Sequence, residues 1–254
     1  METELLLLTG LAGFAAGLLD SIVGGGGLIL TPAMLNLHPG LGILQTISTQ
    51  RTSSILGTSV AAWNYLRHVS IERHILMPAC AAALVASAIG VQFAKRMDPH
   101  VLKLIVLGIC VLLAVYTVLR KDLGTREERR FPAAREAWAA AGVGAACGFY
   151  NGLIGPGTGT LMVFAFVSVI GLDFLKSSAV SKASNVAADL SSWTVLAIGG
   201  FVQWALALPL IVGNMLGSYL GSHLAIRRGD RFIRMVFLGV VLALVARIGW
   251  GLLS

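Results

Sequence analysis

Four apolar stretches, each about 20 residues long, constrain this chain more than any other feature, because a helix needs that length to cross roughly 30 Å of hydrocarbon. They lie near residues 75–94, 101–119, 202–226 and 233–253. Hydrophobic residues make up 56% of the 254 positions and charged residues only 12%. That leaves too little polar surface to cover a soluble globule. The sequence therefore predicts an all-α polytopic membrane protein.

The net charge of +7 has two interpretations. A basic chain can bind nucleic acid, but a membrane protein also collects Lys and Arg in its cytoplasmic loops. We favour the membrane interpretation and expect no nucleic-acid partner. The first segment, METELLLLTGLAG, has two acids and no basic residue, unlike a cleaved signal peptide, so we expect it to remain in the mature protein.

An internal repeat relates the two halves of the chain through a constant 131-residue offset. The offset superposes glycines, prolines and charges without an insertion, including Gly13 on Gly144, Gly17 on Gly148, Pro78 on Pro209, Gly90 on Gly221 and Arg96 on Arg227. Chance matches between Gly-rich helices are common, but one offset through breakers, turns and charges indicates a real repeat.

Each half is expected to contain a broken, re-entrant helix hairpin followed by three transmembrane helices. The first repeat, 1–120, has the hairpin at 3–37 and helices near 43–67, 74–96 and 100–120. The linker covers 121–136. The second repeat, 137–254, has the hairpin at 137–170 and helices near 176–198, 202–226 and 232–253.

The distribution of basic residues distinguishes parallel from inverted repeats. If the glycine-interrupted stretch crosses the membrane once, the repeats are parallel; if it folds back as a hairpin, they are inverted. The single-crossing arrangement puts the two largest basic clusters on opposite sides, whereas the hairpin arrangement gives one clearly positive side, which marks the cytoplasm. That side collects thirteen basic residues, Arg67, Arg73, Arg120, Lys121, Arg126, Arg129, Arg130, Arg135, Lys176, Arg227, Arg228, Arg231 and Arg234, against Lys95, Arg96, Lys103 and Arg247. We predict inverted repeats with a cytoplasmic linker and periplasmic termini.

The two remaining basic residues, Arg51 and Lys182, fall inside membrane segments and are mates under the same 131-residue offset. An ionisable group at bilayer depth is costly and marks a functional site by default. Their surroundings are polar, with STQRTSS in the first half and SKASN in the second. The alternative is a structural network in which Lys182 and Asp189 neutralise each other.

Glycine-rich turns precede these cations in both halves, as GGGG at Gly24, Gly25, Gly26 and Gly27 and as GPGTG with Gly155, Gly157, Thr158 and Gly159. A hairpin turning there exposes backbone N–H groups and begins a short helix whose positive dipole end can hold an anion. Small residues also serve close helix packing, and we prefer that interpretation for Gly13, Gly17, Gly90 and Gly221.

Other polar residues complete the expected site. Asp20 and Asn151 are symmetry mates, each four residues before its turn. Asp20 and Asp189 are candidate proton carriers, although Asp20 could instead cap its turn. The predicted substrate-binding set is completed by Gln50, Ser181, Asn185 and Asn151.

The stretches DSIVGGGGLILTPAML, GFYNGLIGPGTGT and KASN together resemble the TauE/SafE sulfite exporter family, also called the toluene sulfonate uptake permease family. The resemblance covers nearly the whole chain. It implies a bacterial inner-membrane secondary transporter for small sulfur-containing or organic anions, such as sulfite, sulfoacetate or related sulfonates. Departures from the family pattern fall at Gln50, Arg51, Asn151 and Asp189.

We therefore predict a transporter, not an enzyme, that works by alternating access and is a candidate for proton coupling. The expected partners are a small anion and the lipid bilayer, with a homo-oligomer left open. Cys80, Cys110 and Cys147 are scattered in apolar segments, so no metal site or cofactor is expected. The alternatives are a membrane-embedded sulfur-transfer enzyme or assembly factor, and a cation or metal permease.

Overall fold

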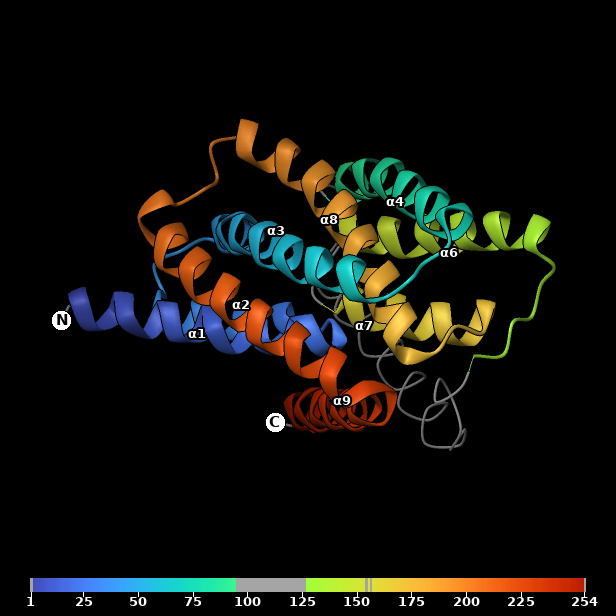
Figure 1. Ribbon diagram of the computed structural model, residues 1–254. Coiled ribbons are helices and arrows are strands. Elements are labelled where there is room, and N and C mark those ends of the chain that lie inside the picture. The colour runs from blue at the N-terminus through green and yellow to red at the C-terminus, as the bar shows by residue number, and fades with distance from the viewer. Residues whose placement is uncertain (1, 95–126, 154, 156, 254) are drawn as a thin grey trace.

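A computed structural model describes residues 2–94, 127–153, 155 and 157–253 of the protein. The expected helix at 100–120 and the first part of the linker lie outside these residues. All regular structure in the described ranges is helical, which confirms the all-α prediction for them (Figure 1). The helices are α1 (Glu2–Val23), α2 (Gly26–Leu37), α3 (Ile43–His68), α4 (Arg73–Ala94), α6 (Ala133–Leu153), α7 (Thr158–Ala165), the π-helical η1 (Phe166–Ile170), α8 (Phe174–Ile198) and α9 (Trp204–Leu253).

Among the described residues, three helices are long and apolar enough to cross a membrane, at Thr3–Val23, Arg73–Phe93 and Trp204–Gly239. Gly229, with φ of +71° and ψ of −166°, interrupts the helical conformation of α9. Glycine has no Cβ, so it adopts such a conformation without a steric penalty. The chain changes direction there, between the two stretches where the sequence predicts separate helices.

The first glycine turn folds α2 back along α1. Gly24, with φ of +84°, ends α1, and α2 starts two residues later. Near the far end of this hairpin, Thr9 Oγ1 lies 2.9 Å from His38 Nε2. Between turn and end, Ala16 packs against Leu30 and Met34. The two helices are therefore antiparallel neighbours.

The second glycine turn does the same for α6 and α7. Gly155 and Gly157 have φ of +85° and +87°, and Gly157 is the residue before α7. Behind the turn, buried residues from the two arms share one core cluster, including Ala140, Val143 and Cys147 from α6 and Met162 from α7.

The tips of the two hairpins meet inside the molecule. The Thr160 N–H donates to the Gly24 carbonyl oxygen at 3.3 Å. A Cβ on Gly24 would lie 2.2 Å from the carbonyl carbon of Gly159, so no side chain fits between the tips. The hairpins reach this point from opposite ends: the first opens towards the end that carries the N-terminus, and the second towards the end where the segment before α6 runs (Figure 1).

Each long hairpin helix packs against a helix of the other half, α1 on α9 and α6 on α4. Glycines bring the backbones close together. A Cβ on Gly148 would lie 2.5 Å from the carbonyl oxygen of Ala83, and one on Gly17 would lie 2.3 Å from that of Asn214. Both contacts obey the offset of the repeat. Small residues at such positions permit close helix packing in membranes, as the sequence predicts.

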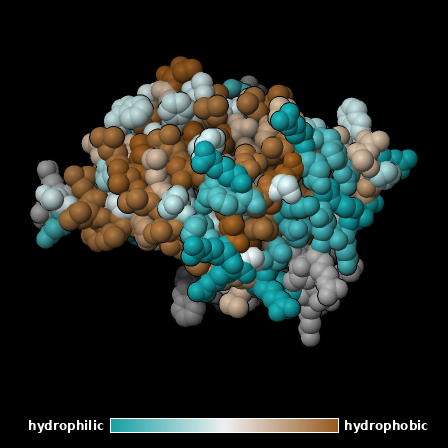
Figure 2. Space-filling view, viewed as in Figure 1, coloured by the Kyte–Doolittle hydropathy of each residue, from teal (hydrophilic) through white to brown (hydrophobic). Residues whose placement is uncertain are grey.

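The polar helices α3 and α8 lie at the centre, and apolar side chains cover much of the outside. Buried polar residues on these two helices include Thr49, Arg51, Ser181 and Lys182. Hydrophobic residues spread over the side formed by α1 and the first part of α9, while hydrophilic residues gather towards the opposite end (Figure 2). This distribution suits a bilayer around the apolar side and water at the polar end.

Candidate functional site: a charged cavity where the hairpin tips meet

A small cavity of about 50 Å³ lies where the two hairpin tips meet helices α3 and α8. Residues of both halves line it, and almost all of them are polar or glycine. They are Asp20, Gly24, Gly26, Gly27, Leu30, Gln50, Arg51, Ser54, Asn151, Gly155, Gly157, Gly159, Asn185, Asp189 and Asn214. Irregular backbone at membrane depth is tolerated where it lines such a cavity.

Arg51 projects from α3 towards the second hairpin. Its Nη2 donates to the backbone carbonyl oxygen of Asn151 at 2.6 Å. Gly155 lies against the guanidinium, since a Cβ there would be 2.7 Å from Nη2. The residue is 5% exposed, and Nη1 is buried without a hydrogen-bond partner in the described chain. A buried guanidinium nitrogen without a partner is an unsatisfied hydrogen-bond donor, which the oxygen of a bound ligand could satisfy.

Lys182 projects from α8 towards the first hairpin and makes the equivalent contact. Its Nζ donates to the backbone carbonyl oxygen of Asp20, which is the mate of Asn151 in the repeat. The same Nζ forms a salt bridge of 3.3 Å with Asp20 Oδ2. Each cation therefore holds the last turn of the other half's hairpin helix.

The carboxylates break this correspondence. Asp20 accepts hydrogen bonds from Thr58 Oγ1 at 3.2 Å and from the Gly26 N–H at 3.3 Å. At the equivalent place in the second half, Asn151 Nδ2 donates to Asp189 Oδ1 at 2.9 Å. Asp189 is the mate of Thr58 in the repeat. The carboxylate and its neutral partner have thus exchanged positions between the halves.

The structure brings most of the predicted site residues together around the cavity. Four of the predicted substrate-binding residues are not among those that line it: Lys182, Ser181, Gly25 and Thr158. In place of the alternative network of Lys182 with Asp189, Lys182 forms a salt bridge with Asp20. Sequence reasoning missed Asn214, a polar residue in an otherwise apolar stretch of α9 that could have served as a signal.

Local hydrogen bonds occupy one amide of the first glycine turn and one carbonyl of the second. The Gly26 N–H, at the start of α2, donates to the carboxylate of Asp20, so this amide already has an anionic partner inside the protein. At the second turn, the Gly155 carbonyl accepts from Thr158 Oγ1 at 2.7 Å. One amide of the first turn and one carbonyl of the second are thus satisfied within the protein, whereas Nη1 of the cavity-lining Arg51 is an unsatisfied donor.

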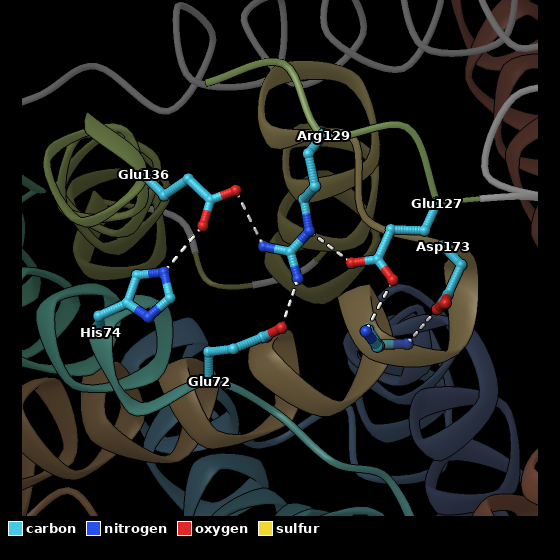
Figure 3. A network of polar contacts seen from close by, with 7 residues as sticks. Glu72, His74, Glu127, Arg129, Glu136 and Asp173 are labelled. Atoms are coloured by element: carbon cyan, nitrogen blue, oxygen red, sulfur yellow. Dashed lines mark hydrogen bonds and ion pairs between the residues drawn. The ribbon is translucent and has the colours of Figure 1, made fainter. Parts of the chain in front are cut away.

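A second polar cluster joins the segment before α6 to its neighbours (Figure 3). That segment runs at the end of the molecule away from the N-terminus (Figure 1). Arg129, in the segment before α6, donates to Glu72 at 2.8 Å, to Glu136 at 3.1 Å and to Glu127. Glu127 also accepts from Lys176 Nζ at 2.7 Å. Further bonds, from His74 to Glu136 and from the Lys176 N–H to Asp173, extend the cluster. It ties the segment before α6 to α4, α6 and α8.

Electrostatics within this cluster favour its charged state. Desolvation opposes the charge on Glu127, but hydrogen bonds from Lys176 and Arg129 outweigh it and lower the pKa of the carboxyl group. Desolvation likewise opposes the charge on Arg129, while its bonds to Glu72 and Glu127 raise the pKa of the guanidinium. The ionised forms of Glu72 and Glu127 therefore stabilise the cluster.

Within the described residues, no group of three His, Cys, Asp or Glu side chains is placed to hold a metal ion. Cys80 and Cys147 are free thiols, and Cys110 lies outside the described residues.

Comparison with known proteins agrees with the resemblance noted in the sequence. The family model described as sulfite exporter TauE/SafE matches residues 9–248. A probable membrane transporter protein, ORF9, of Sinorhizobium sp is 31% identical over 249 residues, covering 96% of this chain and 92% of that protein. The probable membrane transporter protein YfcA of Escherichia coli K12 is 28% identical over 237 residues, 92% and 85% of the two chains. No solved structure matches. The chain therefore belongs to the TauE/SafE sulfite exporter family and is a membrane transporter rather than an enzyme.

Proposed function

We propose that the protein is a secondary transporter of small sulfur-containing or organic anions, such as sulfite, sulfoacetate or related sulfonates. The observation that carries this proposal is the buried, unpaired Nη1 of Arg51 beside a small polar cavity. A guanidinium offers a planar fork that suits the oxygens of a sulfonate or carboxylate. The matching family, described as sulfite exporters, supports the same substrate class.

Transport follows alternating access between two inverted repeats. Meeting hairpin tips and the exchange of packing partners between halves, α1 with α9 and α6 with α4, support this organisation. In transporters built from inverted repeats, the substrate site lies near the midplane at the repeat interface and is formed by broken helices. The cavity at the hairpin tips suits that position.

The membrane is the bacterial inner membrane, with the segment around Arg129 in the cytoplasm and the termini in the periplasm. Ten of the thirteen basic residues that suggest this orientation are described, at the ends of α3, α4 and α8, in and before the first turn of α6, and around Gly229. The positive-inside rule assigns such an end to the cytoplasm. Proton coupling is part of the proposal, with Asp20 and Asp189 as the two carboxylates beside the cavity.

The proposal is tested by transport assays in proteoliposomes. Sulfite, sulfoacetate and methanesulfonate are offered to the wild type and to Arg51→Ala. We expect transport of at least one of these anions, and its loss in the variant. Arg67→Ala is the matched control, because Arg67 stacks on Trp63 at the end of α3 and is remote from the cavity. Unchanged transport in Arg51→Ala, or no transport of any anion by the wild type, would contradict the proposal.

A further inference from the structure

The two cations of the site differ in one respect that the repeat does not predict. Lys182 bonds to the backbone carbonyl of Asp20, and the side-chain carboxylate of the same residue forms a salt bridge with the Lys182 ammonium group. Arg51 has no such salt bridge with its backbone partner, because the equivalent residue is Asn151. The second carboxylate, Asp189, lies one contact further away, behind the Asn151 amide. One cation is therefore neutralised directly and the other is not.

Exposure follows the same division. Lys182 is fully buried and does not line the cavity, and its ammonium group is occupied by the carbonyl and carboxylate of Asp20. Arg51 lines the cavity and keeps Nη1 unpaired. An entering anion therefore meets Arg51 and not Lys182.

With all four of its ionisable groups charged, the site carries no net charge before any substrate binds. Arg51 and Lys182 supply two positive charges, and the ionised side chains of Asp20 and Asp189 supply two negative ones. A monoanion entering this cavity would leave one uncompensated negative charge, and an unpaired buried charge is strongly unfavourable. Binding a proton together with the anion restores neutrality.

We propose that Arg51 is the one cation of the site that contacts the anion and that Asp189 takes up the accompanying proton; this proposal rests on the anion transport proposed above. The salt bridge between Lys182 and Asp20 is then a structural contact that persists when the anion binds and attaches the first hairpin to α8. This assignment gives the two halves of the repeat different tasks, a working half and a structural half.

The contacts of the two carboxylates select Asp189 over Asp20. Asp20 accepts from Lys182, Thr58 and the Gly26 N–H, all of which stabilise its ionised form. Asp189 accepts from the neutral amide of Asn151 and forms no salt bridge with any residue of the described ranges.

The charged groups that act on Asp189 are Arg51 on α3, Asp20 on α1 and Lys182 on its own helix, α8. From α4 the nearby group is the neutral hydroxyl of Ser87, which bonds Asn151 Oδ1. When an anion engages Arg51, it screens the one cation that is not already paired. Arg51 then stabilises the ionised form of Asp189 less, so the carboxylate of Asp189 takes up a proton from water.

The experiment uses purified full-length protein and methanesulfonate, a monoanion that does not itself titrate near neutral pH. Calorimetric titration in buffers of different ionisation enthalpy counts the protons taken up on binding. We expect about one proton per anion and an affinity that falls about tenfold per pH unit on the alkaline side of the Asp189 titration. In Asp189→Asn the proton count falls to zero and the pH dependence disappears, while Glu72→Gln, at the remote polar cluster, behaves as the wild type.

A second variant tests the assignment of the anion contact. Combining Asn151→Asp with Asp189→Thr reproduces in the second half the arrangement of the first, which would neutralise Arg51 as Lys182 is neutralised. We expect a loss of methanesulfonate affinity of at least about tenfold, with the thermal transition retained. Wild-type affinity in this double variant would overturn the role of Arg51.

A third measurement needs no ligand. Lys182→Met should lower the thermal transition temperature far more than Arg51→Met, because it breaks the direct salt bridge of the buried Asp20 carboxylate, whereas the carboxylate of Asp189 is bonded to the amide of Asn151 and not to Arg51. Equal destabilisation would overturn the division of tasks. Binding without proton uptake would overturn the role of Asp189 and leave anion transport standing, whereas absence of binding together with absence of transport of all three anions would reject both.

Discussion

Arg51 and Asn151, one from each half of the chain, are joined by a hydrogen bond of 2.6 Å between Nη2 and the backbone carbonyl oxygen. Lys182 and Asp20, their mates in the repeat, are joined in the same way. In each case a cation on a central helix holds the tip of the opposite hairpin. The hairpin tips and the charged cavity therefore form one mechanical unit, and we expect a substitution in a tip to change the geometry of the cavity.

Gly155→Ala should disturb this unit directly. Gly155 has φ of +85°, and a Cβ there would lie 2.7 Å from Arg51 Nη2. An L-residue in the left-handed region costs about 1–2 kcal/mol, and the methyl group also displaces the guanidinium. We expect anion transport in proteoliposomes to fall at least about tenfold. Gly40→Ala is the control, since nothing lies within 4 Å of the position where its Cβ would be; equal loss in both variants would speak against a specific role of the tip.

Gly148→Ala should separate α6 from α4. A Cβ at this position would lie 2.5 Å from the carbonyl oxygen of Ala83, in contact with rigid backbone. Overpacking of this kind costs about 1–3 kcal/mol, which thermal unfolding in detergent would register as a lower transition temperature. On the same helix, Gly142 has open space around it, and Gly142→Ala should be neutral or stabilising by up to about 1 kcal/mol through helix propensity. The opposite order would refute the close-packing role of Gly148.

The polar cluster around Arg129 should make stability depend on pH at the acid side. Desolvation alone would raise the pKa of Glu127, but hydrogen bonds from Lys176 and Arg129 outweigh it, so the pKa is lowered. The pKa of Glu72 is lowered as well. For a carboxyl group with a lowered pKa, the stabilisation is present above the ordinary value of the unfolded chain and is lost as the pH falls through the lower, folded value.

The matching measurement compares the thermal transition of wild type and Arg129→Gln between about pH 3 and pH 7. We expect the wild type to be more stable near neutral pH and the difference to shrink as the carboxylates become protonated. Arg130→Gln, at an exposed neighbour whose backbone N–H bonds to Ile170, should show a smaller difference that does not vary with pH. A constant difference for Arg129→Gln would show that its contribution is packing rather than charge.

Replacing Cys80, Cys110 and Cys147 together by Ala should leave anion transport intact. Cys147 is buried in the apolar core between α6 and its neighbours, and the Sγ of Cys80 lies 3.7 Å from Ser184 Oγ on α8. Neither thiol lines the cavity. Loss of transport in the triple variant, with the wild-type thermal transition retained, would revive the alternative of sulfur transfer through a thiol.

The sequence was sufficient to predict the class of protein and to single out most of the residues that line the cavity. Apolar stretches of membrane length, a repeat at a constant offset and two cations inside the membrane are properties of single segments, so they can be read without knowing how the segments pack. The family resemblance is confirmed by the match over residues 9–248. The division into repeats and their inversion stay predictions, since the helix expected at 100–120 lies outside the described residues.

The tertiary structure alone decided which charge pairs with which. From spacing along α8, Lys182 and Asp189 share a helix face, which made them look like partners. In the folded protein the hairpin of the other half comes closer, and its Asp20 takes the ammonium group. A buried charge is stabilised by the nearest group that can bond to it, and nearness across a repeat interface depends on how hairpins from opposite ends approach each other. Arg51 and Lys182 are equivalent positions of the repeat, but Arg51 bonds to Asn151 rather than to an aspartate. For this reason Arg51, which lines the cavity, keeps an unpaired nitrogen.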